Sequence, residues 1–393
     1  MEHIWFGKEV YLNLIRVMSK PRRIYSIDVF RGMTIALMIL VNTPGSWAHV
    51  YSPLRHAKWH GCTLTDLVFP FFLFIVGASI RFAFVRWHYF PSIDFYKHVF
   101  WRTLSIFLIG LLLNAYPFIR QDWDYSSFRV MGVLQRIAIA YGLSSIIIIH
   151  FNFKQIMQII FGILLSYWAL LFFGAGNDPY SISENIIRKF DIIVIGKSHL
   201  YRGFQDQFGN SIAFDPEGIL STIPSVASVL LGYLLGGMIH TTKNYSDCAK
   251  RMSVFGIIIL LVGFFWGFYF PINKALWTSS YVLFTAGIGA LILAFLTFII
   301  DNKQIKKPFW VFEIFGKNSI FVFILSGLWV KTIINLKLTM NNNQVSSYNY
   351  LYETVFVPIF GNLNGSLFFA MAHVIIFWII LYWMHKKDIE VKL

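Results

Sequence analysis

The chain has 393 residues, of which 57% are apolar, 19% are aromatic and only 13% are charged, and its formal net charge is +14. A soluble domain could not bury so large a share of apolar side chains. The mean hydropathy of +0.61 comes from apolar runs of about twenty residues, which match the hydrocarbon thickness of a bilayer. We therefore predict an all-α fold, a polytopic integral membrane helix bundle.

The apolar runs predict about ten transmembrane helices, because lipid offers no partner for unpaired backbone groups. In chain order they cover residues 29–48, 65–86, 98–117, 130–149, 155–174, 219–240, 254–271, 277–300, 310–333 and 366–384. A polar insert at about 175–216 and a polar connection at about 334–365 separate some of them. We predict one transmembrane domain, 29–393, preceded by an amphipathic, basic segment, 1–28.

Lysine and arginine are denser before the first span and in alternate connections, as in Arg22, Arg23, Lys306 and Lys307. The positive-inside rule places these connections and both termini in the cytoplasm, and the insert at 175–216 outside. Anionic lipid attracts such basic loop ends, so membrane lipid explains the net charge of +14 without nucleic acid as a partner.

The densest group of polar residues follows the first span, from Asn42 through His56 and His60 to Asp66. A neutral imidazole between two spans can take and return a proton near pH 7. We therefore interpret His56 as a candidate catalytic residue, with Asp66 fixing its tautomer. The alternative is that the histidines are ordinary interfacial residues and that Asp66 caps a helix.

A metal site is a second interpretation of the same loop, because His56 and His60 have i, i+4 spacing and Asp66 follows. Pro, Gly and Trp nearby disfavour a regular helix, and no HExxH motif is present. We expect no metal.

Polar residues also occur within or beside later spans. Arg136, next to Gln135, must face the bundle and suits a phosphate or carboxylate, unless it forms a buried ion pair with Asp66 or Glu217. The remaining candidates are Lys274, Trp277 and Ser279 before the eighth span, and Lys317 and Asn318 in the ninth.

Several of these motifs together resemble the heparan-α-glucosaminide N-acetyltransferase family of membrane acetyltransferases. The motifs are Ser26-Ile27-Asp28-Val29-Phe30-Arg31-Gly32, Val41-Asn42, His56-Ala57-Lys58-Trp59-His60-Gly61, Asp66-Leu67-Val68-Phe69-Pro70, Gly132-Val133-Leu134-Gln135-Arg136, Asp215-Pro216-Glu217-Gly218, Asn273-Lys274 with Trp277, and Gly316-Lys317-Asn318. The chain differs in having Lys58 and His60 where the lysosomal enzyme has Pro and Asn, and in lacking that enzyme's large luminal domain and first span. It resembles a short, bacterial form.

The resemblance implies transfer of an acetyl group from cytosolic acetyl-CoA to the amine of a glucosamine-type sugar across the membrane. By motif the essential histidine is His56, with Asn42 and Asp66 orienting it. Arg136, Gln135, Lys274, Lys317 and Asn318 are then candidates for acetyl-CoA binding. Candidates for acceptor binding are Trp59, His60, Glu217, Trp277 and Ser279.

We expect a multi-pass acetyltransferase of the cell inner membrane that acts on an amino-sugar or glycan acceptor, with a homodimer left open. Two alternatives stay open as well. One is a transporter or flippase for a saccharide or lipid-linked intermediate, and the other is an O-acyltransferase of a cell-envelope polymer. The charges Asp66, Arg136, Glu217 and Lys274 all fall in the outer half of the membrane, although CoA is made in the cytosol.

Overall fold

The computed structural model describes residues 24–85, 87, 92–118, 124–174, 176, 178–205, 209–340 and 343–391. Most of the predicted segment 1–28, and Arg86 at the end of the predicted second span, lie outside these residues. In the described part, nine helices are long and apolar enough to cross a membrane, and a bent helix pair makes ten if it counts as one span. The protein is a polytopic helical membrane protein, which confirms the predicted fold class.

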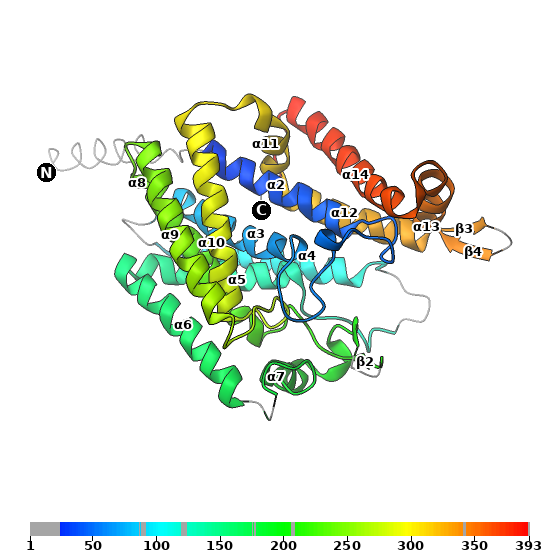
Figure 1. The fold of residues 1–393 in the computed structure, drawn as a ribbon, viewed down its shortest axis with the longest axis horizontal. Helices are drawn as coiled ribbons and strands as arrows, with labels where there is room; N and C mark the ends of the chain where they lie inside the picture. Colours follow the sequence, from blue (N-terminus) through cyan, green and yellow to red (C-terminus); the bar gives the residue numbers. More distant parts are fainter. Residues whose placement is uncertain are drawn as a thin grey trace, which may run out of the picture.

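Figure 1 shows the helices as a single bundle. The spanning helices are α2 (Tyr25–Asn42), α3 (Val68–Ala83), α4 (Ile93–Ala115), α5 (Val133–His150), α6 (Phe153–Gly174), α8 (Ile223–Thr241), α9 (Tyr245–Trp266), α10 (Ser279–Leu296), the pair α11 (Trp310–Lys317) and α12 (Ser319–Asn335), and α14 (Val357–Lys386). Helices α3 and α8 are the most buried, whereas α4, α6 and α9 each have fewer than a third of their residues buried. Side-chain caps begin some of them: Thr278, for example, accepts from the backbone of Tyr281 at the start of α10.

The predicted ninth span, 310–333, is not one straight helix. Helices α11 and α12 meet at Asn318 with a bend of 71°. The side chain of Asn318 donates to the carbonyl of Ile389 at 3.1 Å and accepts from the amide of Val391 at 2.8 Å. The break therefore depends on the C-terminal residues, which a hydropathy pattern does not reveal.

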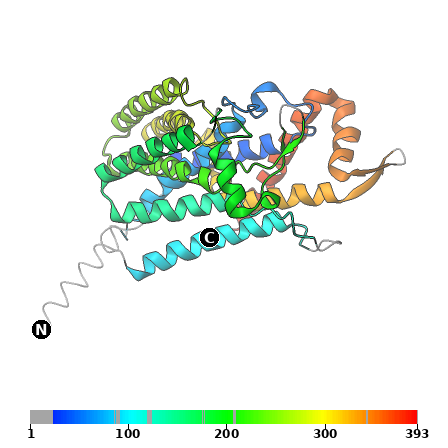
Figure 2. The ribbon, with the colours of Figure 1, turned by 90° about the horizontal axis from the view of Figure 1, so that it is seen from below.

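The last span is longer than the predicted 366–384, and a separate helical segment precedes it. The hairpin of β3 (Lys337–Met340) and β4 (Asn343–Ser346) leads into α13 (Ser347–Leu351) and a π-helical turn, Tyr352–Phe356. Gly361 then breaks the helix with φ of +73°, a value that favours glycine. Figure 2 shows the hairpin projecting from one end of the bundle.

Glycines let neighbouring helices approach to backbone contact. A Cβ atom at Gly316 of α11 would lie 2.1 Å from the carbonyl oxygen of Asp28 in α2. Another at Gly232 of α8 would lie 1.9 Å from the carbonyl oxygen of Phe74 in α3. Small residues are typical of helix interfaces in membranes, where close van der Waals packing replaces the hydrophobic effect.

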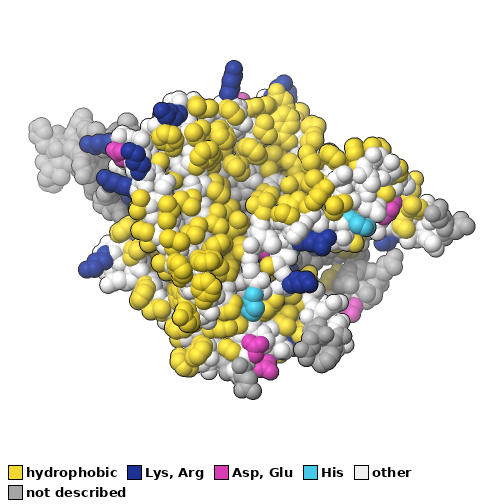
Figure 3. All heavy atoms as spheres, in the orientation of Figure 1, with side chains coloured by type: hydrophobic (Ala, Val, Ile, Leu, Met, Phe, Trp, Pro, Cys, Tyr) yellow, Lys and Arg dark blue, Asp and Glu magenta, His cyan; other side chains and the backbone are white. Residues whose placement is uncertain are grey.

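One end of the bundle carries the predicted insert and the loop that contains His56. The insert contains α7 (Ile186–Ile195) and a short hairpin of β1 (Phe204–Gln205) and β2 (Ser211–Ile212). Figure 3 shows a wide apolar surface over α9, α10 and α14, and a patch with basic and histidine side chains over the loop 43–64. The opposite end carries Lys317 and the described C-terminal residues.

Candidate functional site

The loop 43–64 joins α2 to α3 and holds its shape through its own polar side chains. The hydroxyl of Thr63 donates to the carbonyl of Arg55 at 2.6 Å, and that of Thr65 donates to the carbonyl of Leu54 at 2.7 Å. These two bonds close the loop on either side of His56, which therefore occupies a defined position without being buried.

His56 and Asp66 form a hydrogen-bonded pair. Nδ1 of His56 lies 2.6 Å from Oδ1 of Asp66, and the two side chains are 45% and 2% exposed. Oδ2 of Asp66 accepts two further bonds, from the amide of Ala57 at 3.0 Å and the amide of Thr63 at 3.1 Å. A carboxylate held this firmly fixes the proton on Nδ1 and leaves Nε2 free to accept one.

Lys274 joins this pair from the turn between α9 and α10. Its Nζ lies 3.5 Å from Oδ1 of Asp66 and 3.3 Å from Nδ1 of His56. Two donors cannot satisfy each other, so the lysine is bonded to the carboxylate rather than to the protonated Nδ1. The arrangement places a cation beside the His56–Asp66 pair, which spacing along the sequence did not predict.

The turn that carries Lys274 also fixes the loop backbone. Asn273 is fully buried and donates to the carbonyl of Trp59 at 2.9 Å. The amide of Gly61, whose φ is +112°, donates to the carbonyl of Ile272 at 2.7 Å. A side chain at Gly61 would be strained at this φ, so the glycine permits the contact between the two segments.

The insert packs onto Trp59 and leaves His60 exposed. Trp59 donates from Nε1 to the carbonyl of Tyr180 at 2.8 Å, and its ring packs edge-on against Phe204 and Phe214. His60 has Nδ1 3.3 Å from Nδ2 of Asn273. Partial desolvation of the ring lowers the pKa of His60 although much of the side chain is accessible, and the charge of Asp178 opposes this shift.

Arg136 is completely buried and forms no ion pair with a described residue. It donates to the hydroxyls of Ser221 and Thr222, the latter at 3.3 Å, and lies over the ring of Trp277 at 4.8 Å. Its Nη1 has no hydrogen-bond partner among the residues that the structure describes. A buried cation with a free donor and no carboxylate is costly unless a ligand supplies the anion.

The acids that could have neutralised Arg136 are used elsewhere. Arg129 donates to both oxygens of Asp215, at 2.9 and 2.7 Å, and to Glu217 at 2.6 Å. The sequence had offered Asp66 or Glu217 as a partner for Arg136, and the structure gives both of them other cations. Arg129 is thus a structural residue that the sequence did not single out, because it looked like a loop charge.

Three more candidates lie inside the bundle. Gln135 donates to the carbonyl of Val130 at 3.0 Å, Ser279 donates to that of Leu164 at 2.7 Å, and Trp277 donates to the hydroxyl of Ser228 at 3.3 Å. All three are buried. Trp277 connects the surroundings of Arg136 with those of His56. Its ring lies beneath the Arg136 guanidinium and packs against Tyr281, whose hydroxyl donates to the carbonyl of Asp66 at 2.5 Å.

The other candidates lie apart from His56. Asn42 is exposed at the end of α2 and forms no hydrogen bond with His56 within the described residues. Lys317 lies at the opposite end of the bundle, 2.8 Å from Glu313 and 3.4 Å from Nδ1 of His385, and Asn318 holds the C-terminal residues. Nowhere in the part of the chain that the structure describes do three His, Cys, Asp or Glu side chains gather in a way that could hold a metal ion.

Asp191 of the insert lies against the start of α8. Its Oδ1 accepts from the amides of Ile219 at 3.1 Å and Leu220 at 3.4 Å, while Oδ2 has no hydrogen-bond partner within the described part of the chain. The side chain is 1% exposed, and burial, with the charge of Asp215, raises its pKa from 3.8 to about 7. The folded protein therefore holds this proton more tightly than the unfolded chain does.

We predict a pH dependence of stability that Asp191→Asn removes. Wild-type protein should lose stability as pH rises from about 4 to about 7, because the unfolded carboxyl ionises first; the loss is on the order of 3–4 kcal/mol for a shift of this size. The melting temperature of Asp191→Asn, measured in detergent, should rise relative to wild type between pH 5 and pH 8. The exposed Asp178→Asn serves as the control, and equal pH slopes for wild type and Asp191→Asn would contradict the assignment.

Comparison with known proteins shows the family of the chain. Residues 23–264 match the family model described as heparan-alpha-glucosaminide N-acetyltransferase, catalytic. This multi-pass membrane protein belongs to that family. Two curated relatives carry the name heparan-alpha-glucosaminide N-acetyltransferase. The mouse protein is 26% identical in an alignment 360 residues long that covers 78% of this chain, and the human protein is 26% identical in one 364 residues long that covers 79% of it. The chain spans about half the length of these relatives, 53% in each case.

Proposed function

We propose that the protein is an acetyltransferase that moves an acetyl group from cytosolic acetyl-CoA to the amine of a glucosamine-type sugar on the extracytoplasmic side. The observation that supports it most directly is the His56–Asp66 pair, whose histidine is 45% exposed on a loop between two spans. Family membership supports the same chemistry, because the matched family and both curated relatives are named for N-acetyl transfer to a glucosaminide.

In this proposal Nε2 of His56 acts as the base. The acceptor amine loses a proton to Nε2, its nitrogen bonds to the carbonyl carbon of the thioester, and the C–S bond breaks. The proton then passes to the departing thiolate, which leaves as CoA. Asp66 stabilises the imidazolium between these steps. In the second route Nε2 itself attacks the thioester carbonyl carbon, the C–S bond breaks and the CoA thiolate leaves, so that acetyl-His56 forms. The amine then attacks this acetyl carbon, the bond to Nε2 breaks, and the proton of the amine passes through the imidazole to the thiolate.

The proposed acetyl-CoA residues are Arg136, Gln135, Lys274, Lys317 and Asn318. Arg136 has the strongest support, since its free Nη1 and missing ion-pair partner suit an anionic ligand. Lys274, in contrast, lies beside the His56–Asp66 pair and could equally polarise the thioester carbonyl. Lys317 and Asn318 lie at the opposite end, where CoA would arrive from the cytosol.

The proposed acceptor residues are Trp59, His60, Glu217, Trp277 and Ser279. Trp59 and His60 follow His56 on the same loop. An aromatic ring beside a polar side chain suits the face of a sugar ring. Trp277 is linked to Asp66 through Tyr281, and Glu217 is paired with Arg129. Asn42 is retained as an orienting residue that would have to approach His56 when substrate binds.

The same proposal fixes the orientation in the cell inner membrane, with both termini cytoplasmic. We predict that a reporter fused after Leu393 is active only in the cytosol and that one inserted near Asn210 is active only outside, because the Lys- and Arg-rich connections stay inside. Alkaline phosphatase and green fluorescent protein fusions measure this directly. A periplasmic C-terminus would mean that one of the assigned spans does not cross.

The activity itself is tested with membranes containing the protein, labelled acetyl-CoA and a panel of amino sugars and polyols. We expect label on the amino sugars and none in membranes without the protein. Label on polyols alone would support an O-acyltransferase. Movement of a saccharide without any dependence on acetyl-CoA would support the transporter.

A further inference from the structure

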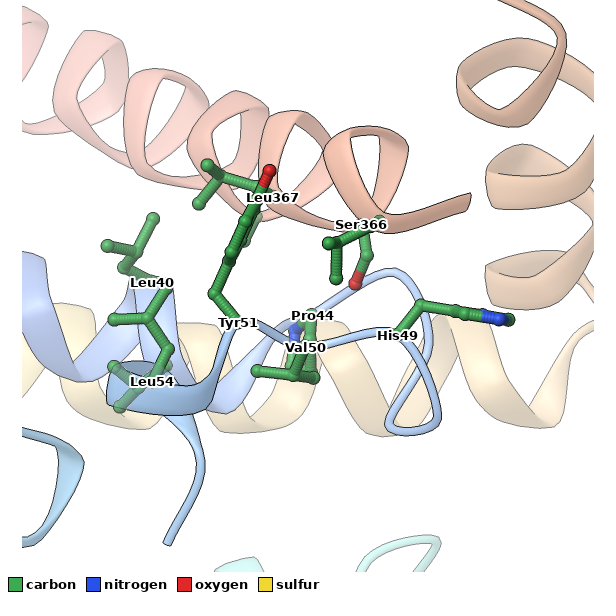
Figure 4. Close-up of a pocket in the computed structure, with 11 residues that line it drawn as sticks. Leu40, Pro44, His49, Val50, Tyr51, Leu54, Ser366 and Leu367 are labelled. Carbon is green, nitrogen blue, oxygen red and sulfur yellow. The ribbon is translucent and has the colours of Figure 1, made fainter. Parts of the chain in front are cut away.

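A narrow apolar pocket lies beside the His56 loop, between α2 and α14. Figure 4 shows Leu40, Leu54 and Leu367 around it, with the ring of Tyr51 rising toward α14. The hydroxyl of Tyr51 donates to the side-chain oxygen of Asn364 in α14. The pocket has a volume of about 10 Å³, enough for one water-sized group. Because its walls are apolar, a methyl or methylene group suits it better than water does.

The pocket adjoins a surface that lipid would cover. Leu363, which lines the pocket, is 40% exposed, and its neighbours Ile359 and Phe360 are 68% and 40% exposed. In a membrane-spanning bundle such side chains face hydrocarbon. A hydrocarbon chain in the bilayer could therefore lie along α14 and place one branch in the pocket.

A cation stands at the rim of the same pocket. Nε of Arg55 donates to the carbonyl of Val50, a pocket residue, at 2.7 Å, and Nη2 donates to the carbonyl of Ala48 at 3.4 Å. Arg55 and Lys58 are exposed, and neither forms an ion pair with a described residue. The guanidinium is thus held in place by backbone carbonyls and its charge is left for an anion.

Three features follow one another along the loop: residues that line the apolar pocket, the fixed cation of Arg55 and the proposed base His56. Tyr51 borders the pocket, Arg55 stands at its rim, and His56 comes next. We infer that the acceptor is a lipid-linked amino sugar, with its hydrocarbon chain along α14 and one methyl or methylene group in the pocket, its phosphate at Arg55 and its amine at His56. This inference rests on the proposed acetyltransferase function and names its substrate class.

The test compares four acceptors with the purified protein in nanodiscs: glucosamine, decyl glucosaminide, glucosamine 1-phosphate and the decyl phosphodiester of glucosamine 1-phosphate. We expect the largest kcat/KM for the phosphodiester. A charge-assisted contact at Arg55 should contribute about 10–100-fold, and each methylene removed from water about fourfold.

Two substitutions separate the contributions. Ala370→Phe, which fills the pocket, should lower kcat/KM only for the two decyl acceptors. Arg55→Gln should lower it only for the two phosphorylated ones. The controls are Met371→Phe, on the exposed side of α14, and Arg202→Gln, an exposed arginine of the insert. Each control substitution should change kcat/KM by the same factor for all four acceptors.

The inference is overturned if chain and phosphate together change kcat/KM by less than about twofold, a difference below one weak contact, while glucosamine is still acetylated. The proposed function would then stand with a soluble acceptor. It is also overturned if both substitutions act equally on all four acceptors. If none of the four is acetylated by folded protein, the proposed function fails as well.

Discussion

His56→Ala should abolish acetyl transfer in a protein that still inserts, purifies and binds acetyl-CoA. A general base contributes typically about 10²–10⁴-fold, and no other described side chain is placed to replace Nε2. Folding should survive, because His56 is 45% exposed and because Asp66 keeps its bonds to Ala57 and Thr63 and its contact with Lys274. Single-turnover assays with labelled acetyl-CoA measure the loss.

His60→Asn is the matched control, since His60 lies on the same loop and contacts Asn273 rather than Asp66. It should keep most activity. Label that stays on wild-type protein without acceptor, and not on His56→Ala, would favour the acetyl-His56 route over the simple base. Near-normal turnover by folded His56→Ala would rule out both routes.

Arg136→Ala should weaken ligand binding more than it destabilises the fold. Loss of a charge-assisted contact should raise KM for acetyl-CoA or for the acceptor by about 10–100-fold. The fold should tolerate the change because removing Arg136 leaves no carboxylate unpaired. Isothermal titration with acetyl-CoA and melting curves in detergent measure the two effects separately.

Arg129→Ala provides the contrast for that experiment. Its removal leaves Asp215 and Glu217 without their cation, and breaking such a pair costs about 3–5 kcal/mol when it is buried. Arg129→Ala should therefore lower the melting temperature more than Arg136→Ala does. The reverse order, with unchanged ligand binding in Arg136→Ala, would make Arg136 a structural residue.

Hydropathy was sufficient to predict the membrane fold because each span is a local property of about twenty residues. The failures came where a distant segment decides the geometry. The break at Asn318 depends on bonds to Ile389 and Val391. The helical segment before Gly361 falls within the connection at about 334–365 that the sequence predicted only as polar.

The site shows the same division. The predicted contact between His56 and Asp66 is present in the structure. The two residues are close in sequence, and the polar segment that carries them stands out between two apolar spans. Lys274 was assigned to cofactor, yet it lies beside His56, 218 residues away in sequence. The sequence did not decide whether Arg136 binds a ligand or forms an ion pair. The structure shows that Glu217, one of its two candidate partners, is paired with Arg129 instead. Side-chain partnerships of this kind depend on tertiary packing, which one sequence does not display.

A sided transfer assay tests the central claim most directly. Proteoliposomes with glucosamine trapped inside receive labelled acetyl-CoA outside, with His56→Ala vesicles in parallel. The account predicts labelled N-acetylglucosamine inside the wild-type vesicles and none in the His56→Ala vesicles. Release of unmodified glucosamine without any acetylated product, or equal product from both proteins, would contradict it.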